Sequence, residues 1–433
     1  MRRYLDLVVH IGEDSYSFGL CLRFDWLAQR TVAVSDATSL HQEISSFLEK
    51  AQPLFDSIGK IVIISDIAHR FEALVEQNPR FIGYIRIAQD QYEPEYMREL
   101  LTSSGGALLT EYMRPGEPIT DSRIQKMIER FMTAGISDIA ILSAYQLGIT
   151  DIPQLLKEHC ERLFPGYFSY HNLDSSEYES FLLSENRLLA GLCIKKALKD
   201  EVDTIISACK SHDLDAPIFI MSGEGVCVDQ TTALKDPVIT WKSRYAAVLT
   251  GSARLFGLSD AIAVSPTAEG IMIDRIKEYR PVPMGRTKRY FSLQVSGPMT
   301  GAVEFRGVPH RQRLLEAINR VNTEPGPLPI IDLTDGLLDG LEIEESVYRL
   351  KSYQSALLTG AQCALFRKDF YGAAPVKNPM RQLKSSLYEE SIRWLASSGI
   401  TVNGRRDEYL EIKLRYLNAD YHKVRLRVRG RIN

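Results

Sequence analysis

The sequence lacks the usual features of secreted, membrane-embedded or strongly basic proteins. No window is apolar over the ~18 residues that a membrane span requires, so we expect no membrane association. The net charge of −3 predicts no general affinity for nucleic acid or anionic membranes. There is no C-x-x-C pair, and most cysteines lie in apolar surroundings. We therefore expect buried reduced thiols and a cytoplasmic location for the six cysteines Cys21, Cys160, Cys193, Cys209, Cys227 and Cys363.

Common catalytic signatures are missing as well. The chain has no Ser-His-Asp order, no H-E-x-x-H and no P-loop sequence, and we predict no metal site from the residues alone. What it does have is an ordinary globular composition. Its 433 residues are 45% hydrophobic and 25% charged, which is enough for two or three domains with sizeable cores.

Strands and helices alternate along the first two thirds of the chain. Residues 5–11 and 17–24 predict a hairpin of two strands, and the apolar run 60–65 predicts a buried strand. Helical spacing covers 120–133 and also 179–211, the latter as one long helix or two. This alternation predicts an α/β fold with mostly parallel or mixed sheets.

Residues 216–274 are the stretch around which the rest of the chain can be placed. An apolar strand at 217–221 ends in a turn that contains Gly223 and Gly225. Next come a strand-like run at 237–240, a small-residue helix at 246–255, a strand at 260–264, a turn at 265–267 and a returning strand at 270–273. This order of elements is typical of a nucleotide-binding lobe.

The last third of the chain ends in a strongly basic segment. Residues 347–365 have helical spacing, and residues 372–379 resemble a loop. Residues 409–417 and 422–428 predict a β-hairpin whose turn is 418–420. In its second strand Arg425, Arg427 and Arg429 alternate with apolar residues, so they share one face. That face is either solvated or a site for an anionic partner, such as an acidic protein surface or nucleic acid.

Two polar positions at strand ends each have two interpretations. His10 is either a general base or ligand, or part of a polar hairpin tip. Asp332 follows an apolar strand, where acidic residues often line a ligand cleft. A cap-and-turn role for the neighbouring Asp335 and Gly336 is the favoured interpretation there.

Four segments resemble the hydantoinase A/oxoprolinase family over roughly residues 4–275. They are VVHIGEDSYSFGLCL near the N-terminus, IISDIAHRFEALVE, EYESFLLSENRLLAGL, and the run from PIFIMSGEGV through SRYAAVLTGSARLFGLSDAIAV. The resemblance implies a two-lobed actin-like (ribonuclease H-like) ATPase fold with a C-terminal α+β extension. We expect an N-terminal lobe at 1–185, a second lobe at 186–345, and C-terminal helices with a basic hairpin at 346–433.

The resemblance also implies two phosphate loops of the form D-x-G-G-T-x-T-D, and here the sequence departs from the family. In the first loop the leading aspartate is His10 and the second glycine is Glu13. The second loop falls on 265–269, which lacks both glycines and the leading aspartate, and Pro266 removes an amide donor. Backbone N–H groups reach a phosphate only where side chains are absent, and a carboxylate in that cradle repels an anion.

These departures favour a protein that keeps the scaffold without its catalysis. The family pattern places the nucleotide or ligand candidates at Gly12, Asp14, Ser222, Gly223, Glu224, Gly225, Ser243, Ser265 and Thr267. Because Arg244 and Tyr245 put bulky side chains beside Ser243, we expect a pseudoenzyme that has lost ATP hydrolysis. It would need no cofactor and would serve as a regulatory or structural subunit through a protein partner or as a homo-oligomer.

Two other functions stay open. One is an ATP-dependent cyclic-amide hydrolase or carboxylase subunit with a remodelled site. In that case Mg²⁺ and ATP would bind between Gly12 and Asp14 on one lobe and residues 223–225 on the other, and ATP would phosphorylate the amide oxygen. The other is a nucleic-acid-binding protein that uses the arginine-rich strand.

Overall fold

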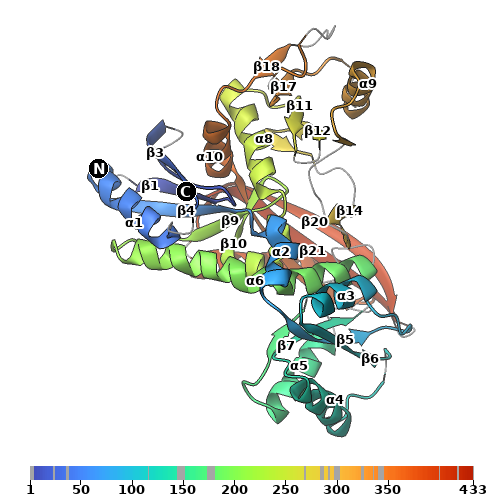
Figure 1. Cartoon of the computed structure of the whole chain (residues 1–433). Helices are drawn as coiled ribbons and strands as arrows, with labels where there is room; N and C mark the ends of the chain where they lie inside the picture. The colour runs from blue at the N-terminus through green and yellow to red at the C-terminus, as the bar shows by residue number, and fades with distance from the viewer. Residues whose placement is uncertain are drawn as a thin grey trace.

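The computed structural model of the chain describes residues 4–432 except 23–24, 36–38, 116, 144–151, 173–180, 268–269, 283–286, 291–292, 297–302, 323–325, 335, 340–345, 399 and 417–418. Figure 1 shows three regions, with a second sheet at the top, the first and largest sheet in the middle, and an inserted sheet at the bottom. This arrangement confirms the predicted α/β class.

Nine strands form the first sheet, in the order β20-β21-β19-β10-β9-β4-β1-β2-β3. Its central strands β1, β4 and β9 are parallel, and they are near-continuous apolar runs because both faces are covered. β2 and β3 continue from β1 as an antiparallel meander. The strands are β1 (Tyr4–Ile11), β2 (Ser15–Leu22), β3 (Asp25–Ala33), β4 (Ser57–Ser65), β9 (Ile218–Met221), β10 (Val226–Asp229), β19 (Leu365–Pro375), β20 (Val402–Tyr416) and β21 (Ala419–Ile432).

The second sheet repeats the strand order of the centre of the first. An antiparallel hairpin, β11–β12, is followed by β17 and β18, which are parallel to β11, in the order β13-β12-β11-β17-β18. Helix α9 packs its apolar face on this sheet. The elements are β11 (Ala261–Pro266), β12 (Gly270–Lys277), β13 (Arg280–Pro281), β16 (Val303–Arg306), α9 (Arg311–Val321), β17 (Ile330–Asp332) and β18 (Val347–Arg349).

A four-stranded parallel sheet is inserted between β4 and β9, in the order β6-β5-β7-β8. It has a core of its own beneath α4 and α5. The single 30-residue helix α6 then runs from this insertion back across the first sheet. The elements are β5 (Phe81–Ile87), α3 (Glu95–Ser103), β6 (Ala107–Met113), α4 (Asp121–Thr133), β7 (Asp138–Ser143), α5 (Ile152–Leu163), β8 (Ser169–His171) and α6 (Phe181–Lys210).

Helices α8 (Ser243–Phe256) and α10 (Tyr353–Cys363) form a shared layer between the first and second sheets. A Cβ atom on Gly251 would lie 1.8 Å from the carbonyl oxygen of Ala356, and one on Gly360 would lie 1.7 Å from that of Ala247. The two backbones therefore touch where only glycine fits. The first turns of α8 pack on the first sheet, and Leu249 and Ala253 pack on the second.

The remaining elements are helices and a separate two-stranded sheet. They are α1 (Leu40–Ala51), η1 (Gln52–Leu54), η2 (Ile67–Arg70), α2 (Phe71–Gln77), α7 (Gln230–Lys235), η4 (Pro237–Thr240), β14 (Thr287–Tyr290), β15 (Leu293–Ser296) and α11 (Met380–Ser397). Within the described residues, none of the helices combines the length and the apolar character needed to cross a membrane. All six cysteines are buried with free thiols, as predicted.

Three local predictions are wrong in whole or in part. Residues 237–240 form the 3-10 helix η4 because Pro237 has no N–H for a strand ladder and its fixed φ suits a first helical turn. Residues 347–365 contain β18 before α10, which begins where Ser352 Oγ accepts from Ser355 N–H. Residues 372–375 belong to the strand β19 because they pair with β21, and residues 376–379 form the predicted loop.

The C-terminal hairpin is confirmed as β20 and β21, and it is longer than predicted. Of its predicted turn, residue 418 lies outside the described residues. The domain boundaries at 185 and 345 stay predictions.

Candidate functional site

Asp66 lies at the carboxyl end of β4 and is 5% exposed. Its Oδ2 lies 3.3 Å from His10 Nε2, near the end of the neighbouring parallel strand β1, and 3.4 Å from Arg244 Nη1 at the start of α8. Burial by itself would raise the pKa of the Asp66 carboxyl, but the hydrogen bond from His10 and the charge of Arg244 outweigh it and lower that pKa. Asp66 is thus an ionised carboxylate at the end of β4 that contacts both the end of β1 and the start of α8.

The start of α8 connects the two sheets. Lys242, which precedes the helix, has a left-handed φ of 63°, a strained conformation for a residue with a side chain. Its ammonium pairs with Glu304 on β16 and lies 3.5 Å from Met272 Sδ on β12. The predicted site residue Ser243 points the other way, and its Oγ donates to the carbonyl of Ser65 on β4 at 3.1 Å.

His69 on η2 lies beside these residues. Its Nε2 accepts from the backbone N–H of Lys242 at 3.4 Å. Burial lowers the pKa of the imidazole, Asp66 opposes this, and the charges of Lys242 and Arg244 lower it further, so His69 is neutral. Arg244 also lies over the ring of Tyr353 on α10, 5.4 Å from its centroid. We refer to His10, Asp66, His69, Lys242, Arg244 and Tyr353 as the junction cluster.

Among the residues that the structure describes, two buried atoms of the junction cluster find no hydrogen-bond partner. They are His10 Nδ1 and Asp66 Oδ1, on side chains that are both more than nine-tenths buried. A buried polar atom without a partner costs about 1–3 kcal/mol. These atoms are therefore the positions at which the cluster can accept a water or a polar ligand.

The β1–β2 hairpin is closed by its own backbone. The N–H of Gly12 donates to the carbonyl of Ser15 at 3.0 Å, and a Cβ on Gly12 would lie 2.8 Å from His10 Cε1. Gly12 is therefore required for packing against His10. Glu13 and Asp14 form the exposed tip, whereas His10 is 2% exposed, so its interpretation as part of a polar tip is wrong.

At the β11–β12 hairpin, side chains of the hairpin and of α8 hydrogen-bond to one another. The buried Ser265 Oγ lies 3.1 Å from the hydroxyl of Tyr245, which lies 2.5 Å from Asp274 Oδ2. Burial and then the Asp274 carboxylate raise the pKa of Tyr245 well above its ordinary value. Thr267 is exposed, and its Oγ1 accepts from Gly270 N–H at 3.0 Å. Residues 268 and 269, between them, lie outside the described residues.

The turn at 222–225 is packed between other elements. The N–H of Ser222 donates to Val226 at 2.8 Å, and a Cβ on Gly223 would lie 2.0 Å from the carbonyl oxygen of Trp241. Gly225 has a φ of +76°, which favours glycine. The carboxylate of Glu224, 9% exposed, pairs with Arg367 on β19.

The arginines of β21 have acidic neighbours on adjacent strands. Arg427 donates from Nε and Nη2 to the two carboxylate oxygens of Asp369 at 2.7 and 2.8 Å and is 8% exposed. Arg429 donates to Glu408 at 3.0 Å, and Arg425 is half-buried. An anionic partner would compete with Asp369 and Glu408 for these groups. The anionic-partner interpretation stays a prediction.

The residues present do not fit a Mg²⁺–phosphate complex of the family type. His10 and Ser265 stand where the two leading carboxylates would be, and both hydrogen-bond to neighbours. Among the residues that the structure describes, no group of three or more His, Cys, Asp or Glu side chains could hold a metal ion. Asp332 accepts from the N–H and hydroxyl of Thr334 in a local turn, and Asp335 lies outside the described residues.

Sequence reasoning missed the centre of the junction cluster. Asp66 directly follows an apolar strand beside β1, and acidic residues at the carboxyl ends of neighbouring parallel strands often mark a site. That signal could have identified Asp66. Nothing in the local sequence indicates Tyr353, which α10 brings in from 287 residues further along the chain (353 − 66).

No protein-family profile matches the sequence, and no curated protein matches it. Solved structures do match. The ATP-dependent caprolactamase from Pseudomonas jessenii is 12% identical, with a TM-score of 0.64 over 99% of this chain and 88% of that chain. Nucleotide-free acetone carboxylase is 10% identical, with a TM-score of 0.63 over 100% and 88%. This chain therefore has, along its whole length, the fold of a chain from each of these two enzymes.

Proposed function

We propose that the protein is a hydantoinase A/oxoprolinase-like subunit that no longer hydrolyses ATP and acts as a regulatory or structural member of a protein assembly. The observation that carries this proposal is the junction cluster. At the ends of β1 and β4, where a metal–phosphate complex needs free carboxylates, Asp66 already binds His10 and Arg244. The fold shared with two ATP-dependent enzymes supports the ancestry.

The second hairpin supports the same proposal. Tyr245 binds Ser265 and Asp274 where a phosphate loop would need open backbone, and Pro266 has no N–H to donate. A single altered loop could still leave part of a nucleotide site. Alteration of both leaves no pair of facing cradles for the phosphates.

Binding of Mg-ATP tests the proposal directly. We expect millimolar Mg-ATP to leave the melting temperature unchanged and to give no binding heat, with the P. jessenii caprolactamase as the positive control. A nucleotide bound at a hundred times its Kd would stabilise the fold by about 2.7 kcal/mol and raise the melting temperature by several degrees. Such a rise would overturn the proposal.

The second candidate is an ATP-dependent cyclic-amide hydrolase or carboxylase subunit with a remodelled site. The unpartnered His10 Nδ1 and Asp66 Oδ1 beside the neutral His69 favour it, because buried polar atoms and perturbed pKa values are typical of functional sites. Phosphate release from ATP in the presence of a hydantoin or lactam would support it. That release should then be lost in Asp66→Asn and kept in Asp121→Asn, which changes an exposed carboxylate.

A further inference from the structure

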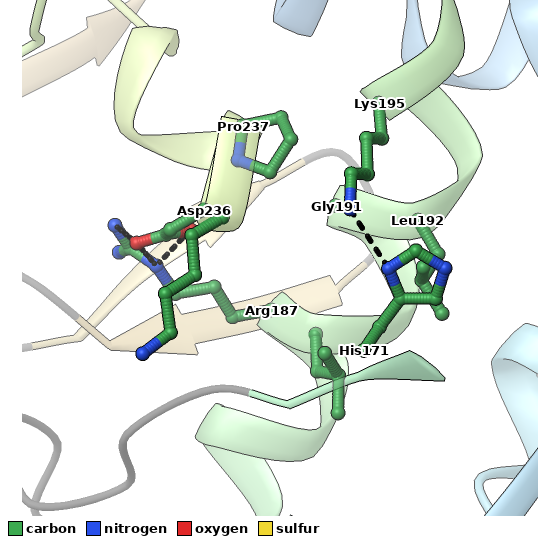
Figure 2. A pocket seen from close by; sticks show the side chains of 9 residues that line it. His171, Arg187, Gly191, Leu192, Lys195, Asp236 and Pro237 are labelled. Carbon is green, nitrogen blue, oxygen red and sulfur yellow. Dashed lines mark hydrogen bonds and ion pairs between the residues drawn. The ribbon is translucent and has the colours of Figure 1, made fainter. Parts of the chain in front are cut away.

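A small pocket lies where the end of the inserted sheet meets α6 and η4 (Figure 2). Figure 2 shows the Lys195 side chain of α6 pointing to the imidazole of His171 on β8. Lys195 Nζ lies 2.9 Å from His171 Nδ1, and His171 Nε2 lies 3.1 Å from Asp138 Oδ1 on β7. The three side chains thus form a continuous hydrogen-bonded row that ends at the pocket.

The hydrogen bonds among Asp138, His171 and Lys195 indicate which ring nitrogen of His171 carries the proton. The hydrogen bond from His171 lowers the pKa of Asp138, with burial opposing it, so Asp138 is an ionised acceptor for the Nε2–H group. With its proton on Nε2, the imidazole presents a lone pair at Nδ1 to Lys195. A nucleophile, a base within hydrogen-bond reach and a third group that orients the base are the arrangement of an activated nucleophile.

The surroundings of Lys195 favour its neutral amine. Burial lowers the pKa of Lys195, Asp138 opposes this, and the charge of Lys199 lowers it further. On the opposite wall Asp236 is bound by Arg187 through bonds of 2.6 to 2.9 Å, as the dashed lines in Figure 2 show. The other charged groups nearby, Lys235 at the pocket and Arg80 beside Asp138, are cationic.

We propose that Lys195 is a nucleophilic amine for formaldehyde or an aldehyde of similar size, with His171 as its proton acceptor and Asp138 as a positioning residue. The Nζ lone pair forms a bond to the carbonyl carbon, the carbonyl π bond breaks onto oxygen, and one Nζ proton passes to His171 Nδ1. Return of that proton to the oxygen gives a carbinolamine, and loss of water gives the imine. The electrophile must be small, because the pocket holds about one water molecule. This site is separate from the junction cluster, so the proposal does not depend on the proposed function.

Reductive trapping tests the site in the intact protein. The protein is treated with formaldehyde and cyanoborohydride between about pH 6 and 10, and adducts at each lysine are quantified by peptide mass spectrometry. Lys199 is the internal control, because it lies one turn further along α6 with its side chain 60% exposed. At pH 7 we expect Lys195 to react faster than Lys199, because its lowered pKa leaves more of the amine neutral and His171 accepts its proton. Equal or slower reaction of Lys195 across this pH range would overturn the proposal.

Three variants separate an activated amine from a structural hydrogen bond. His171→Gln removes the proton acceptor and should slow Lys195 to the rate of Lys199, while the rate of Lys199 stays unchanged. Asp138→Asn should move the pH profile of Lys195 downward, because the Asp138 charge raises the pKa of Lys195, and it should reduce the rate because His171 loses its orienting acceptor. Lys195→Arg should remove the adduct at this position. An unchanged rate of Lys195 relative to Lys199 in a folded His171→Gln protein would contradict the role of His171. If that variant does not fold, the comparison of Lys195 with Lys199 in the unaltered protein decides.

Discussion

Single residues at the junction cluster have roles that differ from those of the family residues they replace. Gly12 matches a phosphate-loop glycine in sequence, but in the structure it makes room for the His10 ring. His10 replaces a carboxylate and binds Asp66. Glycine is therefore kept at this turn for a different reason than in the family. Because it has no side chain, it lets either a ligand or a neighbouring side chain approach the backbone closely.

Glu201 provides a residue-scale prediction about pH. Its Oε2 accepts from Ser65 Oγ at 2.6 Å, and burial raises its pKa to about 8, against the opposing effects of Ser65 and Arg70. The unfolded carboxyl has a pKa of about 4.3, so the folded protein holds a proton that the unfolded chain releases. The resulting stabilisation is fully present below about pH 4 and is lost as the pH rises to about 8.

We therefore expect Glu201→Gln, which stays neutral, to have a higher free energy of unfolding than the unaltered protein at pH 8. The difference should shrink as the pH falls toward 5. Urea denaturation at both pH values measures it, with Glu49→Gln on the exposed face of α1 as the control. A gain of the same size at both pH values would show that the ionisation of Glu201 is not its cause.

At the scale of elements, the α8–α10 crossing holds the two sheets together. Gly251→Ala should destabilise the protein by about 1–3 kcal/mol or more through overpacking, despite the gain of about 1 kcal/mol in helix propensity. The matched control is Gly191→Ala within α6, where the new Cβ would meet Pro237 Cδ at 3.3 Å, a contact that a small shift relieves. We expect the control to stay within about 1 kcal/mol of the unaltered protein. Urea denaturation of both variants tests the difference, and equal stability of Gly251→Ala and Gly191→Ala would contradict the backbone contact.

Secondary-structure predictions were correct where apolar periodicity extended over many residues. They were wrong for short segments whose structure depends on backbone restrictions or on pairing with distant strands. Apolar spacing predicted the β20–β21 hairpin and the helical structure of α6, and the structure shows that α6 is one helix and not two. The strand predicted at 237–240 failed because a short apolar run is compatible with either structure, and Pro237 selects the helical turn. The loop predicted at 372–379 is correct for residues 376–379 and wrong for 372–375, which pair with β21 as the end of the strand β19.

At the scale of the molecule, the first sheet is completed by strands from both ends of the chain. β19 pairs with β10 on one side and with β21 on the other. The β20–β21 hairpin also covers Phe370 and Leu387, and Arg427 neutralises Asp369. A chain that ends at residue 398 would expose this apolar cluster and the 11-residue edge of β19.

We expect this truncated chain to aggregate, because an uncovered apolar edge strand pairs with other copies. Size-exclusion chromatography and circular dichroism measure the outcome. The control is Leu410→Ser in the full chain, a change at a position on β20 that is 44% exposed, and it should stay soluble. A truncated chain that remains monomeric with an unaltered spectrum would mean that the first sheet does not need the hairpin.

By itself the sequence determined the α/β class, helical structure over most of 179–211 as one helix or two, the basic hairpin and the departures at His10, Pro266 and Tyr245. These follow from local spacing and from side-chain chemistry that no fold can change. Only the tertiary structure decided what those residues do. Asp66, Arg244 and Tyr353 meet because β4, α8 and α10 converge at one junction, and Asp138, His171 and Lys195 meet because α6 passes the inserted sheet. These contacts join segments that lie far apart in the sequence, so the apolar spacing within any one segment does not predict them.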